Sequence, residues 1–328
     1  MMNKHNLLSN SNYLFLHHQF DDFDELATTI KAWDLDFRQL DRGQSKANLS
    51  QIIGANVAFS HAHFNRHYHQ QGSTPPGMRT FGISEDHVTG INWFGHAVTP
   101  SSLLCFPTSK ILEAVSKPNF EVYTISFSEQ LLAKVANLYG LPELDDILIN
   151  EEKLANGDPK VIHNIRILLR KVRYLMQQGS KQVNNIELQQ LLENELPARI
   201  LNALSDSLSV TYAKPTQRKK RQAIKKTCAY INEHPTDPVL VNDLCQYADV
   251  SVRTLENAFK EYYGVTPKHY LRATRLNGAY KEIRDVNSPL TTISDIANKW
   301  GFWHMGQFAK DYRLMYGTLP SQMRRLKN

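Results

Sequence analysis

The spacing of hydrophobic residues changes along this chain, and its first regime has a period of two. Between about Phe37 and Phe127, short segments alternate apolar and polar residues, and turn-like stretches such as GSTPPG and SKPN separate them. Such alternation is typical of strands with one buried face. The pattern therefore predicts a half-buried antiparallel sheet or small barrel, with strands in NLSQIIGANVAFSHAHF, TFGIS, GINWFG, SSLLCFP and FEVYTISF.

From Ser128 to Leu204 the pattern becomes helical. SEQLLAKVANLYG begins with a serine that can cap a helix, carries Glu129 in its first turn and ends in glycine. VIHNIRILLRKVRYLMQQG and NIELQQLLENELPARILNAL then place apolar residues three and four apart. Residues 1–204 are thus expected to form a small β-barrel followed by helices.

The segment from Ser205 to Arg221, SDSLSVTYAKPTQRKKR, is polar, contains Pro215 and ends in a basic run. These features indicate an interdomain linker over residues 205–221. A length of 328 residues also favours two domains. We therefore divide the chain into a first domain over residues 1–204 and a second domain over residues 222–328.

The second domain contains an internal repeat. NDLCQYADVSVRTLENAFKEYYGVTP (242–267) aligns with SDIANKWGFWHMGQFAKDYRLMYGTLP (294–320). Both copies predict a short helix, a tight corner, a second helix, and a glycine stop followed by proline. The apolar stripe of the first helix is Leu240, Leu244 and Tyr247 or Ala248. Ser251 can cap the second helix, which carries Leu255 and Phe259 on one face. Packed stripe against stripe, each copy is a helix-turn-helix, and Gly301 at the second corner can adopt a positive φ.

Helical phase separates the inward residues from the outward ones. With Leu255 and Phe259 inward in the first copy, and Phe308 and Tyr312 inward in the second, polar and aromatic side chains face out. The outward residues are Arg253, Glu256, Asn257 and Lys260, then Trp303, Gly306, Gln307 and Lys310. Between the copies, Thr266 and Pro267 predict the start of a long helix; its Lys268, Arg272 and Arg275 are placed to contact phosphates.

Charge is distributed unevenly between the two halves. The whole chain has a net charge of +6, but residues 214–328 contain 20 Lys and Arg against 10 Asp and Glu, so residues 1–213 are slightly acidic. A basic half joined to an acidic one suggests that the basic half binds a polyanion. A basic surface that is merely solvated is the alternative on charge alone.

The repeat also carries a family resemblance. VNDLCQYADVSVRTLENAFKEYYGVTPKHYLRATRLNGAY followed by ISDIANKWGFWHMGQFAKDYRLMYGTLPSQMRR resembles the C-terminal DNA-binding domain of AraC/XylS-type bacterial transcription regulators, over roughly Gln222 to Arg325. The front half, with FNRHYHQQGSTPPGMRTFGI and FEVYTISFSE, is similar to the AraC-binding-like regulatory domains fused to them. Residues 1–204 are therefore expected to be a regulatory, sensing and dimerisation domain. The resemblance implies that the two recognition helices of one monomer enter successive major grooves of promoter DNA.

Specific roles follow for the outward residues of the first copy. Arg253 can bridge guanine O6 and N7, Asn257 can bridge adenine N6 and N7, and Glu256 can accept from cytosine N4. Lys260 is assigned to a phosphate.

In the second copy, Gln307 is the better base reader and Lys310 the phosphate contact. His304, in the first turn, is a candidate for either role. Trp303 either stacks on a sugar or covers the corner, whereas Trp300, Phe302 and Phe308 are expected to belong to the core.

A rival chemistry lies in residues 61–69. His61, His63, His67 and His69 suggest a metal site in a cupin-like barrel, and therefore a metal-dependent enzyme. Yet no Asp or Glu occurs between Asp41 and Glu85, although a carboxylate usually follows the histidine pair in such barrels. A histidine cluster without metal is therefore preferred, and no cofactor is expected. The sequence also lacks G-x-S-x-G, P-loop and H-E-x-x-H motifs.

We conclude that the sequence describes a regulator that is not an enzyme, and expect it to be an activator. The expected partners are double-stranded promoter DNA, RNA polymerase, a small-molecule effector and a second copy of the chain. A front half that only dimerises, without a ligand, stays open. No apolar run of 18 residues occurs, so a cytoplasmic location is expected. Cys105, Cys228 and Cys245 are expected to be buried free thiols.

Overall fold

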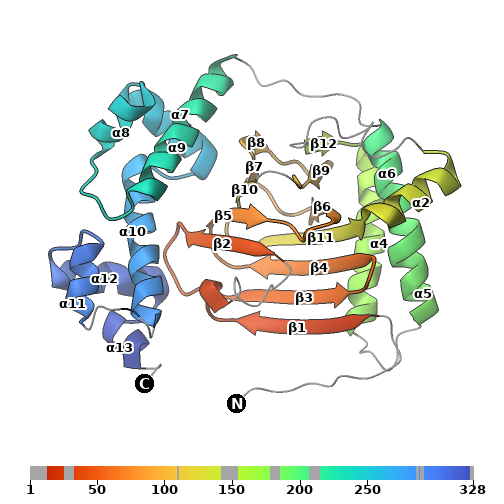
Figure 1. Cartoon of the computed structure of the whole chain (residues 1–328), viewed down its shortest axis with the longest axis horizontal. Coiled ribbons are helices and arrows are strands. Elements are labelled where there is room, and N and C mark those ends of the chain that lie inside the picture. The colour runs from red at the N-terminus through yellow and green to blue at the C-terminus, as the bar shows by residue number, and fades with distance from the viewer. Residues whose placement is uncertain are drawn as a thin grey trace.

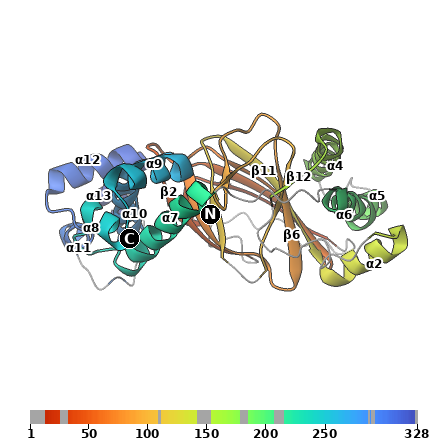
Figure 2. The same ribbon diagram turned by 90° about the horizontal axis from the view of Figure 1, so that it is seen from above.

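The computed structural model describes residues 13–25, 33–108, 111–141, 154–177, 185–206, 215–285, 288 and 292–325. Figure 1 shows an N-terminal part built on β-strands and a C-terminal part built on helices. Figure 2 shows that the C-terminal helices and the helices α2 and α4–α6 lie on opposite sides of the strands. The predicted α+β organisation is confirmed at this level.

The strands form two antiparallel sheets. The seven-stranded sheet has the order β1-β3-β4-β11-β6-β9-β12, and the five-stranded sheet has the order β2-β5-β10-β7-β8. The strands are β1 (Leu14–Phe20), β2 (Asp34–Gln39), β3 (Ala47–Ile53), β4 (Val57–Phe64), β5 (Tyr68–Ser73), β6 (Met78–Ser84), β7 (Asn92–Trp93), β8 (His96–Ala97), β9 (Ser102–Cys105), β10 (Leu112–Val115), β11 (Phe120–Ser128) and β12 (Leu154–Asn156). Because each strand order has two ends among the described residues, the predicted cupin-like barrel is not closed: it is a pair of facing sheets.

The strand pattern predicted from sequence lies mostly in the seven-stranded sheet. Residues of NLSQIIGANVAFSHAHF form the β3–β4 hairpin, in which Ile53 pairs with Ala58. The central strand β11 pairs with β4 and with β6. The side chains of β11 alternate between two hydrophobic clusters. Ile125 belongs to the cluster shared with the helices, and Val122 belongs to the cluster shared with the five-stranded sheet. Both faces of the sheet are therefore covered.

Among the described residues, four α-helices and one π-helical segment cover the outer face of the seven-stranded sheet. They are α2 (Glu129–Tyr139), α4 (Pro159–Gln177), α5 (Asn185–Gln190), η1 (Leu191–Glu195) and α6 (Leu196–Asp206). Ser128 caps α2 by accepting from the Leu131 amide at 3.2 Å, and Gly140 ends it at φ 62°. Both boundaries confirm the sequence prediction, because the caps satisfy amide and carbonyl groups that the helix leaves unpaired.

The region expected to be a linker is partly helical. Helix α7 (Pro215–Glu233) begins inside it, so the basic run at 218–221 lies on a helix. Pro215 stands at the helix start, where its missing N–H costs nothing. Residues 207–214 lie outside the described part of the chain. The first turns of this helix were assigned to the linker because Pro215 and the basic run at 218–221 are typical of linkers.

The remaining helices are those of the two predicted units, the helix that joins the units and a short helix that follows the second unit. They are α8 (Val241–Ala248), α9 (Val252–Tyr263), α10 (Pro267–Arg284), α11 (Ile293–Lys299), α12 (Met305–Tyr316) and α13 (Pro320–Arg325). Ser251 caps α9 and Thr266 caps α10 with Pro267 in its first turn, as predicted. Gly264 and Gly317 end α9 and α12 in the left-handed region. The long helix α10 joins the two units.

The helical part shares a hydrophobic core with the five-stranded sheet, because buried residues of both parts belong to one cluster that includes Phe37 and Phe259. All three cysteines are buried free thiols, which confirms the prediction. Across the part of the chain that is described, no helix is both long and apolar enough to cross a bilayer.

Candidate nucleic-acid interface

The first unit presents α9 with one buried and one exposed face. Leu255 and Phe259 are fully buried, and the N-cap hydroxyl of Ser251 accepts from the Thr254 amide at 3.2 Å. Arg253 and Asn257 are exposed. The helical phase inferred from sequence is therefore confirmed.

The other two residues assigned to this face are also accessible. Lys260 is exposed and Glu256 is partly exposed. Burial raises the pKa of the Cys245 thiol, and the charge of the nearby Glu256 carboxylate adds to this effect. Glu256 therefore stands close to the junction of α8 and α9.

One part of the predicted stripe on α8 is wrong. Leu240 is 67% exposed and Tyr247 is 47% exposed, whereas Leu244 and Ala248 are buried. Leu240 precedes the helix, and its amide donates to Asp243 Oδ2 at 2.8 Å in an N-terminal cap. The helical spacing of Leu240 and Leu244 predicted that both are buried, but Leu240 is the residue before the first turn of α8 and its side chain is exposed.

The second unit presents α12 in the same way. Phe308 and Tyr312 are buried, as expected, and Trp303 is 72% exposed. His304 is the N-cap of α12, but its side chain makes no capping hydrogen bond. Gln307 is exposed and donates to Asp311 Oδ1 at 3.0 Å, a bond that holds the amide in place at the surface. Figure 2 shows α9 and α12 along one edge of the helical part.

The corner of the second unit is built around Trp300. Its Nε1 donates to Glu282 Oε2 at 2.7 Å, and its ring covers Gly278 of α10, where a Cβ would lie 2.1 Å from two ring carbons. Gly301 follows at φ +78°, the predicted positive value. Phe302 packs on Phe308 with ring centroids 5.1 Å apart. Trp300, Phe302 and Phe308 therefore build the corner.

Replacement of Gly301 by alanine should strain this corner. A left-handed backbone with a Cβ costs about 1–2 kcal/mol, so we expect Gly301→Ala to lower the free energy of unfolding by that amount in a urea titration and to weaken DNA binding. Gly140→Ala, at φ 62° with open space around it, is the matched control. It should cost similar stability and leave DNA affinity unchanged; equal DNA affinity for both variants would contradict the assigned role of the corner.

The cations of α10 have different surroundings. Lys268 is exposed. Arg272 forms an ion pair with Asp311 of α12. Arg275 is half-buried and donates to the Asp237 carbonyl at 2.5 Å, and burial lowers the pKa of its guanidinium. Arg272 and Arg275 thus connect α10 to its neighbours inside the helical part.

A cleft of about 590 Å³ brings many of these side chains together. Its lining includes six of the residues that the sequence assigned to DNA contacts: Lys268, Arg272, Arg275, Trp303, His304 and Gln307. Cations from α10 form one wall, and aromatic and amide groups at the start of α12 form the other. Cationic and hydrogen-bonding groups in this arrangement suit a sugar–phosphate strand. Arg253, Glu256, Asn257, Lys260 and Lys310 do not line this cleft.

Two of the four histidines of residues 61–69, His61 and His69, have separate side-chain partners. His61 Nε2 lies 2.7 Å from Glu121 Oε1, and Arg173 Nη1 donates to the same oxygen at 2.7 Å. The carboxylate missing from the local sequence thus comes from β11, but a guanidinium already neutralises it. His69 instead lies 2.9 Å from the Tyr270 hydroxyl. None of these histidines joins a potential metal-binding group among the described residues.

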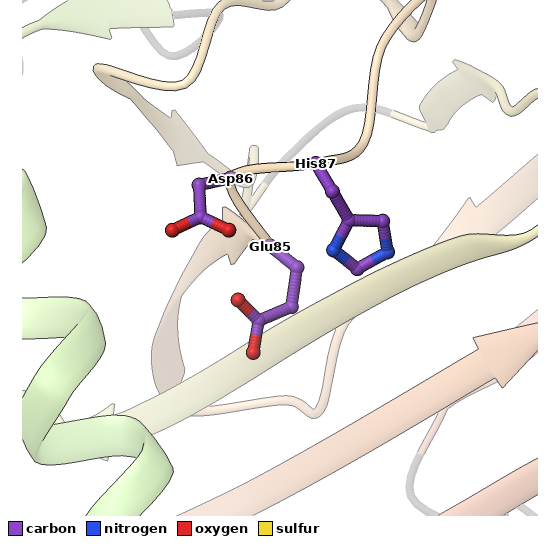
Figure 3. A group of neighbouring side chains, drawn as sticks. All are labelled: Glu85, Asp86 and His87. Carbon is purple, nitrogen blue, oxygen red and sulfur yellow. The ribbon is translucent and has the colours of Figure 1, made fainter.

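Such a group of three does occur on the loop after β6, where Figure 3 shows Glu85, Asp86 and His87. Their ligand atoms lie within 4.8 Å of one another. However, Arg170 forms ion pairs with both carboxylates, and the Tyr123 hydroxyl donates to Glu85 at 2.7 Å. Burial raises the pKa of Glu85, but hydrogen bonds from Arg170 and Tyr123 outweigh this effect and lower it. The hydrogen bond from Arg170 also lowers the pKa of Asp86 by stabilising its charged form. The cluster is an ion-pair network between the loop and α4.

Comparison with known proteins bears on the C-terminal part. Residues 244–326 match a family described as "Helix-turn-helix domain". The XylDLEGF operon transcriptional activator of Pseudomonas putida is 30% identical over 122 residues, which cover 37% of this chain and 38% of that protein. The C-terminal domain is an AraC/XylS-type helix-turn-helix domain. Its two units are α8–α9 and α11–α12.

Other proteins are similar to the AraC/XylS-type domain. The probable thc operon regulatory protein of Rhodococcus erythropolis is 32% identical over 93 residues, 28% of each chain. A crystal structure of a probable AraC family regulator from Rhodopseudomonas palustris is 29% identical and covers 32% of this chain and 97% of that one, with a TM-score of 0.31. The AraC-like transcriptional activator CuxR is 13% identical, with 82% and 96% coverage and a TM-score of 0.45. The chain matches less than two fifths of the length of each of these two sequence relatives.

Proposed function

We propose that this protein is a transcription regulator that binds promoter DNA sequence-specifically through α9 and α12. The observation that carries the proposal is the repeated arrangement of these two helices, each with a buried inner face and an exposed polar outer face. Helix α10 has 18 residues and so spans about 27 Å at 1.5 Å per residue. This length is comparable to the roughly 34 Å between successive major grooves on one side of DNA.

The outer faces carry the side chains that recognise bases. Arg253 is suited to guanine, Asn257 to adenine and Glu256 to cytosine, as base readers in one groove. In the next groove, Gln307 reads a base with Trp303 and His304 beside it at the start of α12.

Phosphate contacts come from the cations around these two helices. They are Lys260, Lys268, Arg272, Arg275 and Lys310. Arg272 can contact a phosphate while it stays paired with Asp311, because its side chain is 46% exposed. Arg275 has the least exposed position of the five.

Arg253→Ala tests the base-reading role. We expect binding to weaken by about 1–3 kcal/mol and base preference to relax at one position of the site, because a bidentate contact to one base is lost. The measurement is fluorescence anisotropy with a panel of sites that each differ by one base pair.

Lys310→Ala is the matched comparison, since a phosphate contact carries no sequence information. It should weaken all members of the panel by a similar factor and reduce the salt dependence by about one unit. A uniform loss with Arg253→Ala as well would remove Arg253 from the base readers.

The N-terminal domain is proposed to sense a small molecule between its two sheets. A cavity of about 70 Å³ lies there, several times the roughly 10–15 Å³ that one water needs. Its lining is mostly apolar and contains no charged side chain, and its polar groups include Gln51, Ser60 and Gln70. Trp93 also lines it, and the buried Trp93 Nε1 has no acceptor among the described residues. An uncharged, largely apolar effector with one hydrogen-bond acceptor fits this lining.

Activation, RNA polymerase contact and dimerisation complete the proposal. The relatives from Pseudomonas putida are named transcriptional activators, which supports activation and a contact with RNA polymerase. Apolar side chains are exposed on α4 and α5, including Ile167 at 47%, Tyr174 at 59% and Ile186 at 79%. These side chains support dimerisation through the helices between Ser128 and Leu204.

The full chain should be tested, because the helical domain shares its core with the five-stranded sheet. We expect it to bind promoter DNA more tightly than random duplex and to lose affinity steeply as salt rises, since phosphate contacts release counterions. Equal binding to promoter and random duplex at every salt concentration would refute sequence-specific regulation.

A further inference from the structure

The five-stranded sheet has two occupied faces. Along β2, Leu35 and Phe37 line the cavity, whereas Arg38 points the other way and donates to the Tyr270 hydroxyl of α10 at 2.8 Å. Along β10, Ala114 lines the cavity and its neighbour Glu113 contacts the helical domain. The alternation of a strand thus places successive residues at the cavity and at the DNA-binding domain.

This sheet contacts the C-terminal end of α9. Tyr263, the last residue of α9, is fully buried, and its hydroxyl donates to Glu113 Oε1 at 2.9 Å. His69 of β5 lies against the same tyrosine, with ring centroids 4.9 Å apart, and its Nε2 is 3.4 Å from Glu113 Oε1. The pKa of Glu113 is lowered through its contacts with His69 and Tyr263, which outweigh the effect of burial. A charged carboxylate therefore holds this end of the first recognition helix.

The same sheet also contacts the C-terminal end of α12. Gln39, the last residue of β2, is fully buried, and its Nε2 donates to the Met315 carbonyl at 2.9 Å. In the following loop, the Gly43 amide donates to the Leu314 carbonyl at 3.0 Å. The last carbonyls of a helix have no partner within it, so the N-terminal domain supplies donors that the second recognition helix lacks.

A third contact ties the sheet to the helix between the two units. Asn277 of α10 exchanges two hydrogen bonds with the backbone of Gln39: Oδ1 accepts from its amide at 3.1 Å, and Nδ2 donates to its carbonyl at 2.9 Å. Position 39 is thus bonded to both α10 and α12, while β10 is bonded to α9. Both recognition helices are fixed to one rigid element besides α10.

We propose that the five-stranded sheet is a brace that sets the position of α12 relative to α9. Gln39 and Glu113 act as positioning residues for DNA reading, although they lie in the N-terminal domain. Gln39 and Gly43 hold the C-terminal end of α12, and Glu113 holds the C-terminal end of α9. Arg253 and Gln307, nearer the other ends of these helices, stay exposed. The other face of the five-stranded sheet lines the cavity. A ligand in the cavity would therefore contact the same strands that hold α9 and α12.

Two variants remove brace contacts with little change in shape. Gln39→Leu deletes the donor to the Met315 carbonyl of α12, together with the bonds of the same amide to the loop carbonyls of Asp41 and Gly43. Tyr263→Phe deletes the donor to Glu113 and the hydroxyl contact with Cys228. Spin labels at Asn257→Cys and Lys310→Cys report the distance between α9 and α12, and the native cysteines are buried. Pulsed electron resonance on the full chain should show one narrow distance distribution, shifted and broadened by either variant. No DNA is needed for this measurement.

Tyr316→Phe is the matched control, because Tyr316 occupies the position of Tyr263 in the second repeat and its buried hydroxyl has no partner among the described residues. It should leave the distribution unchanged. Circular dichroism spectra and thermal melting curves identify any variant that fails to fold. If Gln39→Leu does not fold, the test of the brace rests on Tyr263→Phe, which removes only one hydroxyl. A folded Tyr263→Phe and a folded Gln39→Leu with unchanged distributions would show that α10 alone sets the distance and would overturn the brace.

The consequence for DNA reading rests on the proposed function. Wild-type protein should prefer one spacing between the two half-elements of its site over spacings one base pair longer or shorter, and Gln39→Leu should lose this preference while base preference within each element persists. A retained spacing preference would overturn the proposal for DNA reading. If wild type bound no specific site, the proposed function would fail, and the label distances would still test the brace.

Discussion

Gly278→Ala will lower the free energy of unfolding by about 3–5 kcal/mol, the cost typical of losing a packed aromatic side chain. A Cβ at position 278 would lie 2.1 Å from two ring carbons of Trp300, a contact that the rigid helix α10 cannot relieve. Trp300 must then leave its site and give up its hydrogen bond to Glu282. Urea unfolding measures the loss, and DNA affinity should fall with it because the corner before α12 is displaced.

Gly306→Ala is the matched control for Gly278→Ala. Position 306 also lies in a helix, but a Cβ there has nothing within 4 Å. Alanine stabilises a helix by up to about 1 kcal/mol over glycine, so the free energy of unfolding should stay equal or rise. If the bare surface at Gly306 lets α12 approach the bases, this variant will weaken DNA binding without loss of stability. A Gly278→Ala protein as stable as wild type would contradict the described packing of Trp300.

Acidification from pH 6.5 to pH 4 will destabilise the protein by about 3 kcal/mol through His67 alone, at 1.36 kcal/mol per pKa unit. Burial lowers the pKa of His67 to about 4, and the positive charges of Lys117 and His269 add to the effect. The folded state therefore binds fewer protons than the unfolded state between pH 4 and 6.5. Its stability is complete above pH 6.5 and falls as the pH drops through this window.

His67→Gln should remove about 3 kcal/mol of this pH dependence, by the same conversion, as measured by urea unfolding at pH 7 and pH 4. His67 lies close to the end of α9, because a Cβ built on Gly264 would be 3.4 Å from Cε1 of His67. Protonation of His67 should therefore loosen the contact between the N-terminal domain and this helix. The pKa of His69 is also lowered by burial, and its contribution should remain in the variant. An unchanged pH dependence would exclude His67 as the responsible group.

Features encoded by neighbouring residues were predictable from sequence. Ser251 and Thr266 were identified as caps because a hydroxyl before an apolar-periodic run satisfies the first free amides. Gly301 was identified as the corner because only glycine adopts a positive φ without strain from a Cβ. The inward and outward faces of α9 and α12 followed from the helical period, and the burial of Phe259 and Phe308 confirms that phase.

Features that depend on distant partners were not predictable. Glu121 reaches His61 from a strand 60 residues away, and Gly278 makes room for Trp300 across the corner between two helices. The strands β5 and β10 are short or rich in polar residues, and His69 and Glu113 on their second face contact Tyr263 of the helical domain. Closure of a barrel depends on strand pairing, about which the period of two carries no information.

Selection of binding sites from a random duplex library by the full chain tests the central claim most directly. If α9 and α12 both read bases, the enriched sequences will contain two short elements separated by about one helical turn of DNA. Repeating the selection with Arg253→Ala should relax one position in one element and leave the other element intact. Enrichment of a single element, or no enrichment over the starting library, would contradict recognition through two helices.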